Sequence, residues 1–400
     1  MKSTASPPLS TVTEADAIVI GGGIYGLMIA LEAGKTGRRV LVVERDAVGG
    51  ATSANWFRIL HGGLRYLQTL DIPRVRESVA ERRWFQRFAP DLVRPMRFLM
   101  PLYGDGSRRP TAFRAAFLAD AALSARRNAG LGAGQTLPRG RVLNRAETQA
   151  LYPGVRPEGL RGGALWHDVI AGDGAQLIAR LRAEAEAYGA RVLEGVEARD
   201  LVVERGAAAG VIVKRAGMAP GTVRAPVVIN AAGPWSAGLA ECFGGPAPEL
   251  FRPALAFNLL LAKTPLSDVG LAVSPPDTTN PTLFVYPHEG RIFAGTWHAS
   301  WRQESGRAEP PEAEIDAFLA ALNAALPALG ARRQDVLKIF AGLLPARRAD
   351  SAEPADRAII RDHRETGGPA GLFSVSGVKF TTARRVAEKL VRRLPARKPV

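Results

Sequence analysis

Apolar and polar positions alternate in different ways along this chain of 400 residues, and the pattern is clearest near its start. Residues 17–20 and 40–43 form two short apolar runs rich in β-branched side chains, as in strands buried on both faces of a parallel sheet. Residues 27–36 between them read as a helix that stops at Gly37. The pattern predicts a strand, a helix and a second strand in one βαβ unit.

The pattern changes further along the chain. Residues 74–88, 111–128 and 311–329 have the periodicity of amphipathic helices. Residues 281–297 read instead as a β-hairpin that turns at 288–290. We therefore expect a second unit that combines helices with antiparallel strands.

Composition and charge narrow the classes of function. With 46% hydrophobic residues, the chain can bury a core large enough for two domains. The formal net charge is +15, but only 8 of the 53 basic residues are lysines, and the arginines are scattered along the chain. This distribution predicts no nucleic-acid partner, and it leaves an electrostatic attraction to anionic substrates or lipid head groups.

Cysteine usage and hydropathy indicate the compartment. Cys242 is the only cysteine, which excludes an internal disulfide and a thiolate metal cluster, and we expect no metal site. Residues 1–15 lack the apolar core of a signal peptide and read as a disordered leader. The apolar run at 254–262 is too short to span a bilayer. We expect a cytoplasmic protein, with peripheral association with the inner face of a membrane left open.

Gly21, Gly23 and Gly26 follow the first strand with the spacing G-x-G-x-x-G. Such glycines allow a tight turn, a close approach of the backbone to a pyrophosphate and close packing of a helix on a strand, while the helix N-terminus offers N–H donors to phosphate. Glu44 ends the second strand, where a carboxylate accepts ribose hydroxyls. Because this carboxylate disfavours the 2′-phosphate of NADP, the expected cofactor is FAD or NAD.

The next segment favours FAD. An NAD domain would normally continue into a further helix and strand, but residues 49–53 form a loop of small residues that can follow a longer, extended cofactor. The sequence FRILHGGLRYL then holds two adjacent glycines between His61 and Arg65. Because glycine weakens helices and strands, Gly62 and Gly63 indicate a backbone that passes close to another group.

These residues resemble the flavin-dependent glycerol-3-phosphate dehydrogenases and α-glycerophosphate oxidases, within the D-amino-acid-oxidase-like (DAO) superfamily of FAD oxidoreductases. The resemblance rests on GGGIYG at 21–26, ATS at 51–53, HGGLRYL at 61–67 and the stretch 77–101. It continues patchily in VVINAAGPWS and in GLFSVSGVKFTTARRVAEKLV near the end of the chain. HGGLRYL is the motif specific to that family.

The resemblance implies an α/β fold in which a Rossmann-type FAD-binding domain of the GR2/DAO-like kind carries an inserted α+β substrate domain with an antiparallel sheet. The FAD-binding domain would comprise residues 16–63, 146–240 and 340–400, and the substrate domain residues 64–145 and 241–339. The implied FAD-binding residues are Gly21, Gly23, Ile24, Tyr25, Gly26, Glu44, Arg45, Ala51, Thr52, Ser53, Leu60, Gly62, Gly63, Val196, Ala232, Gly233, Trp235, Gly377, Lys379, Phe380 and Thr381.

In this interpretation Gly62 and Gly63 let the chain approach the flavin ring. A base would take the hydroxyl proton of the substrate, and imidazole suits this role because it titrates near neutrality. The implied catalytic residues are His61, Arg65, His298 and Lys379, of which Arg65 and Lys379 would hold charge on the substrate and the flavin. The implied substrate-binding residues are Arg65, Tyr66, Arg361, Asn258, Leu344 and Trp297.

Some positions depart from the family pattern. Leu344, in AGLLP, stands where the family has an arginine that reaches an anionic substrate, and leucine cannot pair with phosphate. Asn258 stands at a family histidine, and Gly-Thr-Trp-His at 295–298 replaces G-T-T-D. Arg347 or Arg348 could replace the missing charge. Retained FAD residues beside an altered pocket indicate flavin chemistry on an altered substrate.

The resulting hypothesis is an FAD-dependent oxidoreductase that oxidises a small, anionic, glycerol-3-phosphate-like secondary alcohol by hydride transfer to flavin N5. Two alternatives stay open at this point: an amine or amino-acid oxidase of the same superfamily, and a flavin-binding protein whose substrate pocket has decayed. The electron acceptor, whether quinone, oxygen or another protein, is also left open by the sequence.

Overall fold

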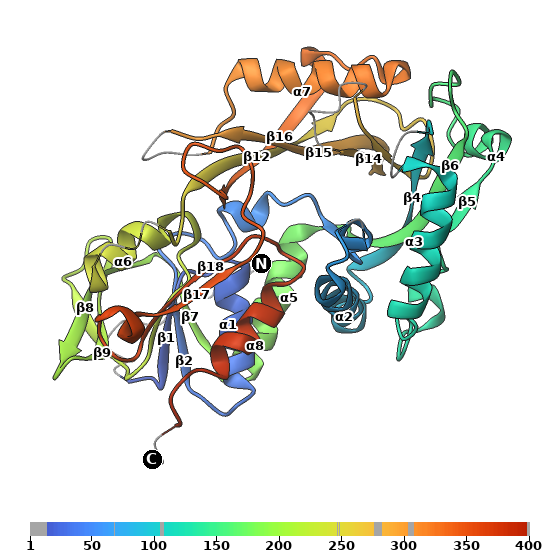
Figure 1. Ribbon diagram of the computed structural model, residues 1–400. Helices are drawn as coiled ribbons and strands as arrows, with labels where there is room; N and C mark the ends of the chain where they lie inside the picture. The colour runs from blue at the N-terminus through green and yellow to red at the C-terminus, as the bar shows by residue number, and fades with distance from the viewer. Residues whose placement is uncertain are drawn as a thin grey trace.

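Figure 1 shows the two lobes of the computed structural model, one around a mainly parallel sheet at the lower left and one around a larger sheet at the top and right. The structure describes residues 14–67, 69–104, 108–245, 247, 249–275, 282–302 and 308–397. The expected leader lies outside these ranges except for Glu14 and Ala15, which bridge to Arg224. None of the helices in these ranges is both long enough and apolar enough to cross a membrane.

The first sheet has six strands in the order β17-β18-β11-β1-β2-β7. Its core strands run parallel, and only the edge strand β17 is antiparallel to its neighbour. The first two strands have the bounds that the apolar runs predict. The strands are β1 (Ala17–Ile20), β2 (Val40–Val43), β7 (Arg191–Leu193), β11 (Val228–Asn230), β17 (Ile359–Asp362) and β18 (Leu372–Ser376).

Side-chain alternation explains what covers the two faces of this sheet. Val19 and Val42 pack in a core with the helices α1, α5 and α8, whereas Ile18 and Leu41 pack against a small antiparallel sheet. The helices are α1 (Ile24–Gly34), α5 (Gly174–Ala187) and α8 (Ala383–Val391), and the small sheet consists of β8 (Val196–Glu204), β9 (Ala207–Arg215) and β10 (Gly221–Arg224), with α6 (Ser236–Gly244) beside it.

The second sheet has nine strands, eight of them in the order β16-β12-β15-β14-β13-β4-β6-β3, with β5 paired to β6. The predicted hairpin is present and turns at Glu289 and Gly290, both with positive φ. Helix α7 (Glu312–Ala325) covers one face. The strands are β3 (Ile59–Leu60), β4 (Val93–Leu102), β5 (Arg141–Leu143), β6 (Gly162–Ala171), β12 (Pro253–Leu261), β13 (Gly270–Val273), β14 (Leu283–His288), β15 (Arg291–Ser300) and β16 (Val336–Pro345).

Two strands of the second sheet come from segments expected from the sequence to lie in the FAD-binding domain. Strand β6 pairs with β4 along its whole length, from Val93 opposite Ala171 to Leu102 opposite Gly162, so residues 162–171 belong to the second sheet. Strand β16, which includes residues 340–345, pairs with β12 in the same sheet. The expected domain limits therefore do not coincide with membership of the two sheets.

Helix α2 (Ile72–Phe88) lies beside both lobes, with α3 (Pro110–Leu123) and α4 (Arg145–Leu151) further along the second lobe. It carries two adjacent charged residues that are almost fully buried, Glu81 and Arg82. Arg384 of α8 donates to both carboxylate oxygens of Glu81, at 3.1 and 2.6 Å. Burial raises the pKa of Glu81 to about 7 despite the neighbouring Arg384 charge. This ion pair joins α2 to the first lobe.

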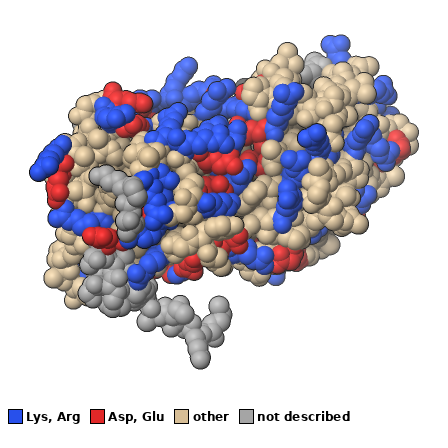
Figure 2. All heavy atoms as spheres, turned by 90° about the horizontal axis from the view of Figure 1, so that it is seen from below, with Lys and Arg blue, Asp and Glu red and all other residues tan. Residues whose placement is uncertain are grey.

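Basic side chains are spread over the surface in the way that the sequence suggests. Figure 2 shows Lys and Arg side chains scattered across one face and interspersed with Asp and Glu. Many of these arginines pair with a carboxylate, as Arg39 does with Asp16 and Arg180 with Asp91.

Replacing Arg384 with methionine is expected to lower the free energy of unfolding by about 3 kcal/mol, because Glu81 would be left buried without a counter-charge. Denaturant unfolding at pH 8 measures this. The matched control is Arg385→Met, since Arg385 is more exposed and, among the residues that the structure describes, pairs with Glu388 alone, so its loss should stay below about 1 kcal/mol. Equal losses in the two variants would contradict a special role for the buried pair.

Candidate active site

The glycine fingerprint forms a tight backbone edge at the end of β1. A Cβ on Gly21, whose φ is +104°, would lie 2.6 Å from the carbonyl oxygen of Ala231, and one on Gly26 would lie 1.8 Å from that of Gly21. Gly22 N–H donates to Glu44 at 2.6 Å, and Ile24 N–H donates to the Ser53 hydroxyl at 2.9 Å. Helix α1 therefore starts three residues earlier than predicted, and Ser53 is brought to its N-terminus.

Tyr25 ties the closing segment of the chain to this edge. Its hydroxyl donates to the carbonyl oxygen of Lys379 at 2.9 Å and accepts from the Lys379 N–H at 3.2 Å. A Cβ on Gly377 would fall 1.8 Å from the Tyr25 ring, so only glycine fits there. Burial raises the pKa of Tyr25 well above the ordinary value of a phenol, so Tyr25 keeps its proton at neutral pH. The fingerprint and the segment around Lys379 are thus held together.

Arg65, Tyr66, Lys379 and His298 come together from three parts of the chain. The Lys379 Nζ lies 4.5 Å and the Arg65 guanidinium carbon 5.1 Å from the Tyr66 ring centre. Burial, reinforced by the Arg65 charge, lowers the pKa of Lys379 to about 7 and that of His298 to about 4. Burial also lowers the pKa of Arg65, against the opposing effect of Asp356. These four residues form the cationic cluster, a site suited to an anion.

His61 lies four residues before Arg65 and faces a buried carboxylate. Its Nδ1 is 3.5 Å from Asp168 Oδ2, and its side chain is 46% exposed, which leaves the ring accessible to a ligand. Asp168 also accepts from the Gly62 N–H at 2.6 Å, from Arg82 at 2.7 Å and from the Trp166 indole at 3.1 Å. Although burial raises the pKa of Asp168, the hydrogen bond from His61 and the Arg82 charge outweigh it, and the pKa is about 2.

Side chains of α2 leave no room for a Cβ at Gly62 or Gly63 in this loop. A Cβ on Gly62 would lie 2.1 Å from the Arg82 guanidinium, and one on Gly63, whose φ is +82°, would lie 2.8 Å from the Ser78 side chain. Both positions therefore need glycine for the close approach of helix and loop. The sequence indicated a close neighbour, and the neighbour that the structure contains is α2.

Two predicted substrate residues lie elsewhere. Trp297 alternates with His298 along β15, so its ring faces away from the cationic cluster: it stacks on Phe318 and donates to Glu314 of α7. Asn258 accepts from the Thr296 hydroxyl at 2.8 Å and donates to the Asn55 carbonyl at 3.1 Å, which ties β12 and β15 to the loop after β2. Trp297 therefore packs, partly buried, against the core of the second lobe, and Asn258 has a structural partner on each side.

Arg347, one of the two arginines that could replace the family's missing charge, and Arg361 are both paired with carboxylates. Leu344 lies in β16 opposite Ala254 and is half-buried. Arg347 pairs with both Glu353 and Asp356, so its charge is already compensated. Arg361 pairs with Glu249 beside the first sheet. Arg65 and Lys379 are left as the cations of the predicted set that gather around Tyr66.

Several expected FAD-binding residues line the same edge. Arg45 lies over the Trp235 ring at 4.6 Å, and both side chains are nearly half exposed. The Phe380 ring stacks on Trp56 at 3.8 Å. Thr52 donates to the Leu343 carbonyl at 3.2 Å. The other members of the set lie in the segments after β2, β11 and β18, in β3 or at the start of β8: Ala51, Leu60, Val196, Ala232, Gly233 and Thr381.

Sequence reasoning missed Asp168, Arg82 and Asp356. Asp168 stands out as the acidic residue within the apolar run ALWHDVIA, and a charge inside a buried strand requires a partner. That signal was available. Arg82 and Asp356 carry no such signal, because each sits in a segment with many other charges.

Comparisons with known proteins agree with this geometry. The family model described as "FAD dependent oxidoreductase" matches residues 16–393. Glycerol-3-phosphate dehydrogenase 1 of Mycobacterium tuberculosis is 34% identical over 388 residues, which cover 94% of this chain and 72% of that protein. Glycerol-3-phosphate dehydrogenase 2 of the same organism is 30% identical over 389 residues, covering 96% of this chain and 64% of that protein.

The fold is also similar to that of a solved glycerol-3-phosphate dehydrogenase. Glycerol-3-phosphate dehydrogenase from Bacillus halodurans, complexed with FAD, superposes with a TM-score of 0.69 at 25% identity over 95% of this chain and 64% of that one. The chain thus spans slightly less than two thirds of the length of several relatives that it matches. The family match over nearly the whole chain confirms the resemblance seen in the sequence: this protein belongs to the FAD dependent oxidoreductase family.

Proposed function

We propose that the protein oxidises a small anionic secondary alcohol related to glycerol-3-phosphate. The observation that carries this proposal is the pairing of His61 with Asp168 four residues before the cationic cluster. The oxidation of an anionic alcohol requires a proton acceptor near an anion site, and His61 stands four residues before Arg65 of the cationic cluster. The names of the relatives, glycerol-3-phosphate dehydrogenases, supply the first substrate to test.

The residues of the first lobe fit FAD. Glycines without side chains form the edge that a pyrophosphate would approach, and the N-terminus of α1 lies at the same edge. Glu44, which accepts from the Gly22 N–H, is the carboxylate that would meet ribose hydroxyls. When bound, FAD accepts the hydride that leaves the alcohol carbon. Tyr25 holds the Lys379 backbone to the same edge, so Lys379 can stabilise negative charge on the cofactor or on the substrate.

His61 is the better of the two candidate bases. As the alcohol becomes a ketone, its hydroxyl proton must pass to a nearby group, and the Asp168 carboxylate stabilises the imidazolium that forms at His61. His298 has no carboxylate partner among the described residues, and its pKa of about 4 makes it a weak proton acceptor. Arg65 binds and orients the anionic end of the substrate so that the hydroxyl lies near His61.

The proposal is tested by adding glycerol-3-phosphate and other anionic secondary alcohols to the purified holoprotein without oxygen and following the flavin absorbance at about 450 nm. Bleaching by such an alcohol supports the proposal. This single-turnover design needs no knowledge of the electron acceptor. A flavin that stays oxidised with anionic alcohols but bleaches with amino acids would refute it and favour an amine oxidase.

Asp168→Asn is expected to slow flavin reduction on the order of 100-fold or more, because the amide keeps the contact with Gly62 but cannot stabilise an imidazolium. Stopped-flow measurement with saturating substrate isolates this step. The control Asp91→Asn removes an exposed carboxylate that pairs with Arg180 and should leave the rate unchanged. A normal rate in Asp168→Asn would rule out His61 acting with Asp168.

The lowered pKa of Asp168 predicts that the folded protein loses stability at acid pH. Its folded pKa of about 2 lies below the value of 3.8 for a free side chain, so its contribution of about 2 kcal/mol is complete above pH 4 and disappears as the pH falls toward 2. Urea unfolding between pH 5 and pH 2 should show a decline that is shallower in Asp168→Asn. The same slope in both proteins would contradict the depressed pKa.

Lys379 predicts the pH dependence of substrate capture. With a pKa of about 7 it is charged below neutrality and loses its charge as the pH rises, so kcat/KM for an anionic substrate should fall through about pH 7. Lys379→Met should raise KM at pH 6 and remove this limb of the profile. Lys389→Met is the control, since Lys389 is half exposed and pairs with Glu77 on the outside. If kcat/KM of Lys379→Met still fell through about pH 7, the fall would have to be assigned to another titrating group.

A further inference from the structure

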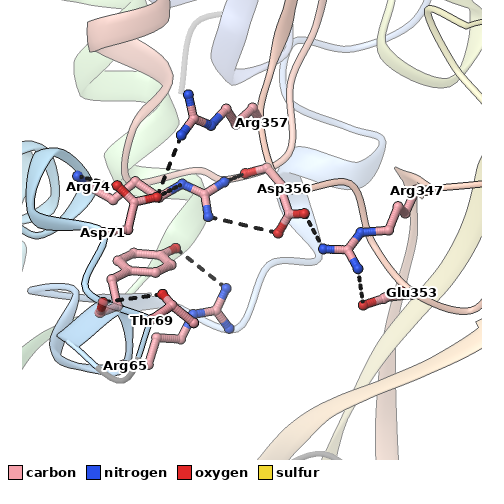
Figure 3. A network of polar contacts seen from close by, with 9 residues as sticks. Arg65, Thr69, Asp71, Arg74, Arg347, Glu353, Asp356 and Arg357 are labelled. Carbon is pink, nitrogen blue, oxygen red and sulfur yellow. Dashed lines mark hydrogen bonds and ion pairs between the residues drawn. The ribbon is translucent and has the colours of Figure 1, made fainter.

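The positive charges around Tyr66 are unevenly compensated. Besides Arg65 and Lys379, a third cation, Arg74, lies over the Tyr66 ring, at 5.1 Å. Figure 3 shows Arg74 within a chain of contacts that runs through Asp356 to Arg347, with Arg65 below it. We call this chain of contacts the Asp356 network; its members are Asp71, Arg74, Arg347, Glu353, Asp356 and Arg357.

Each arginine of the Asp356 network meets a carboxylate. Arg74 lies 3.5 Å from Asp71 and 3.8 Å from Asp356, and it donates to the Asp356 backbone carbonyl as well. Arg357 lies 3.6 Å from Asp71. Arg347 contacts Glu353 at 3.0 Å and also Asp356. Three arginines therefore face three carboxylates, and the network as a whole is close to neutral.

Arg65 and Lys379 differ from these arginines. Within the described ranges, neither forms an ion pair with a carboxylate; Arg65 makes one long contact, 3.4 Å, with the Tyr66 hydroxyl. Arg65 carries a full charge, whereas Lys379 has a pKa of about 7 and is only partly charged at neutral pH. Leu344 contributes no charge from β16. The site offers an anion one full positive charge and a fraction of a second.

Asp356 limits this charge further. Arg65 and Arg74 each lie 5.1 Å from the Tyr66 ring centre, and the Asp356 carboxylate lies 3.8 Å from Arg74. This negative charge, which opposes the lowering of the Arg65 pKa by burial, would also repel an anion bound at Arg65. A dianion is repelled about twice as strongly as a monoanion at the same distance. One guanidinium fork can pair with two oxygens of a carboxylate or of a phosphate. It compensates the whole charge of a carboxylate, whereas a phosphate dianion keeps one uncompensated charge unless a second full cation meets it, and an uncompensated charge is costly to bury.

We propose that the substrate carries a carboxylate and not a phosphate, which makes it a small hydroxycarboxylate, and that Asp356 is the residue that sets this preference. The statement that this ligand is a substrate rests on the proposed oxidation of an anionic alcohol. The preference for a carboxylate over a phosphate is a property of the binding site and does not depend on that oxidation. Asp356 acts through Arg65 and through the network, and it need not touch the ligand.

The experiment measures binding apart from turnover. Oxidised holoprotein is titrated at pH 8, where a phosphate monoester is a dianion, with 3-hydroxypropionate and with glycerol-2-phosphate, and the shift of the flavin spectrum gives each Kd. Neither probe has a secondary alcohol to oxidise. We expect 3-hydroxypropionate to bind at least 10-fold more tightly than glycerol-2-phosphate. Tighter binding of the phosphate by the unaltered protein would overturn the inference.

Two variants test the role of charge. Asp356→Asn should tighten glycerol-2-phosphate binding about fivefold and change 3-hydroxypropionate binding less, while Asp350→Asn, an exposed carboxylate in the same loop, should change neither. Leu344→Arg adds a charge from β16, on the strand face that Gly342 turns toward Thr52, and should also favour the phosphate. If Asp356→Asn loses its FAD, Leu344→Arg decides the matter. Failure of the folded variants to favour phosphate would refute the assignment.

Turnover then separates the two proposals. The same holoprotein is mixed anaerobically with glycerate and with glycerol-3-phosphate, and flavin bleaching is followed. Faster reduction by glycerate supports both the oxidation and the carboxylate preference. Faster reduction by glycerol-3-phosphate overturns the carboxylate preference and leaves the oxidation standing. If neither reduces the flavin while 3-hydroxypropionate still binds more tightly, the oxidation fails and the anion preference survives.

Discussion

Two adjacent buried charges on α2 determine how this protein is assembled around its site. Glu81 and Arg82 are each almost fully buried, and a buried charge is tolerated only when a partner of opposite sign meets it. Glu81 finds its partner in Arg384 of α8, and Arg82 finds its partner in Asp168 of β6. Since these partners belong to different lobes, one turn of α2 links the first lobe to the loop that carries His61.

The need to pair buried charges also explains why a carboxylate stands beside His61. Asp168 must remain ionised because Arg82 would otherwise be buried without a counter-charge, and the ionised carboxylate then stands 3.5 Å from His61. On the other side, Tyr25 fixes the backbone of Lys379 beside the glycine edge. His61 and the backbone of Lys379 beside the glycine edge are therefore held by contacts that also stabilise the fold. The charges outside this arrangement, in the Asp356 network, cancel one another and leave the site weakly positive.

The sequence allowed the first βαβ unit to be predicted because its signals are local. The apolar runs give the bounds of β1 and β2, and the fingerprint glycines are identified by spacing alone. The membership of β6 in the second sheet depends on its pairing with β4, about 70 residues earlier in the chain, and no local pattern contains that information. For the same reason, the sequence does not reveal that residues 340–345, at the end of β16, pair with β12.

The direction of side chains was the second feature that could not be predicted from the sequence. Trp297 and His298 are neighbours in sequence, and only the register of β15 against β12 shows that His298 faces the cationic cluster while Trp297 packs under α7. The pairing of Arg347 with Glu353 and Asp356 likewise depends on the path of a loop. Motif residues such as Arg65, Tyr66 and Lys379 could be named in advance because the family resemblance, and not a physical calculation, pointed to them.

In the proposed site, Arg65 receives the anion while His61, held by Asp168, meets the hydroxyl. A crystal structure of the FAD-bound protein with 3-hydroxypropionate would show whether this is so. We expect the carboxylate within hydrogen-bond distance, about 2.7–3.2 Å, of the Arg65 guanidinium and beside Lys379, with the rest of the ligand directed toward His61. A carboxylate bound at another cation, such as Arg361 or Arg45, with Arg65 still unliganded, would contradict it.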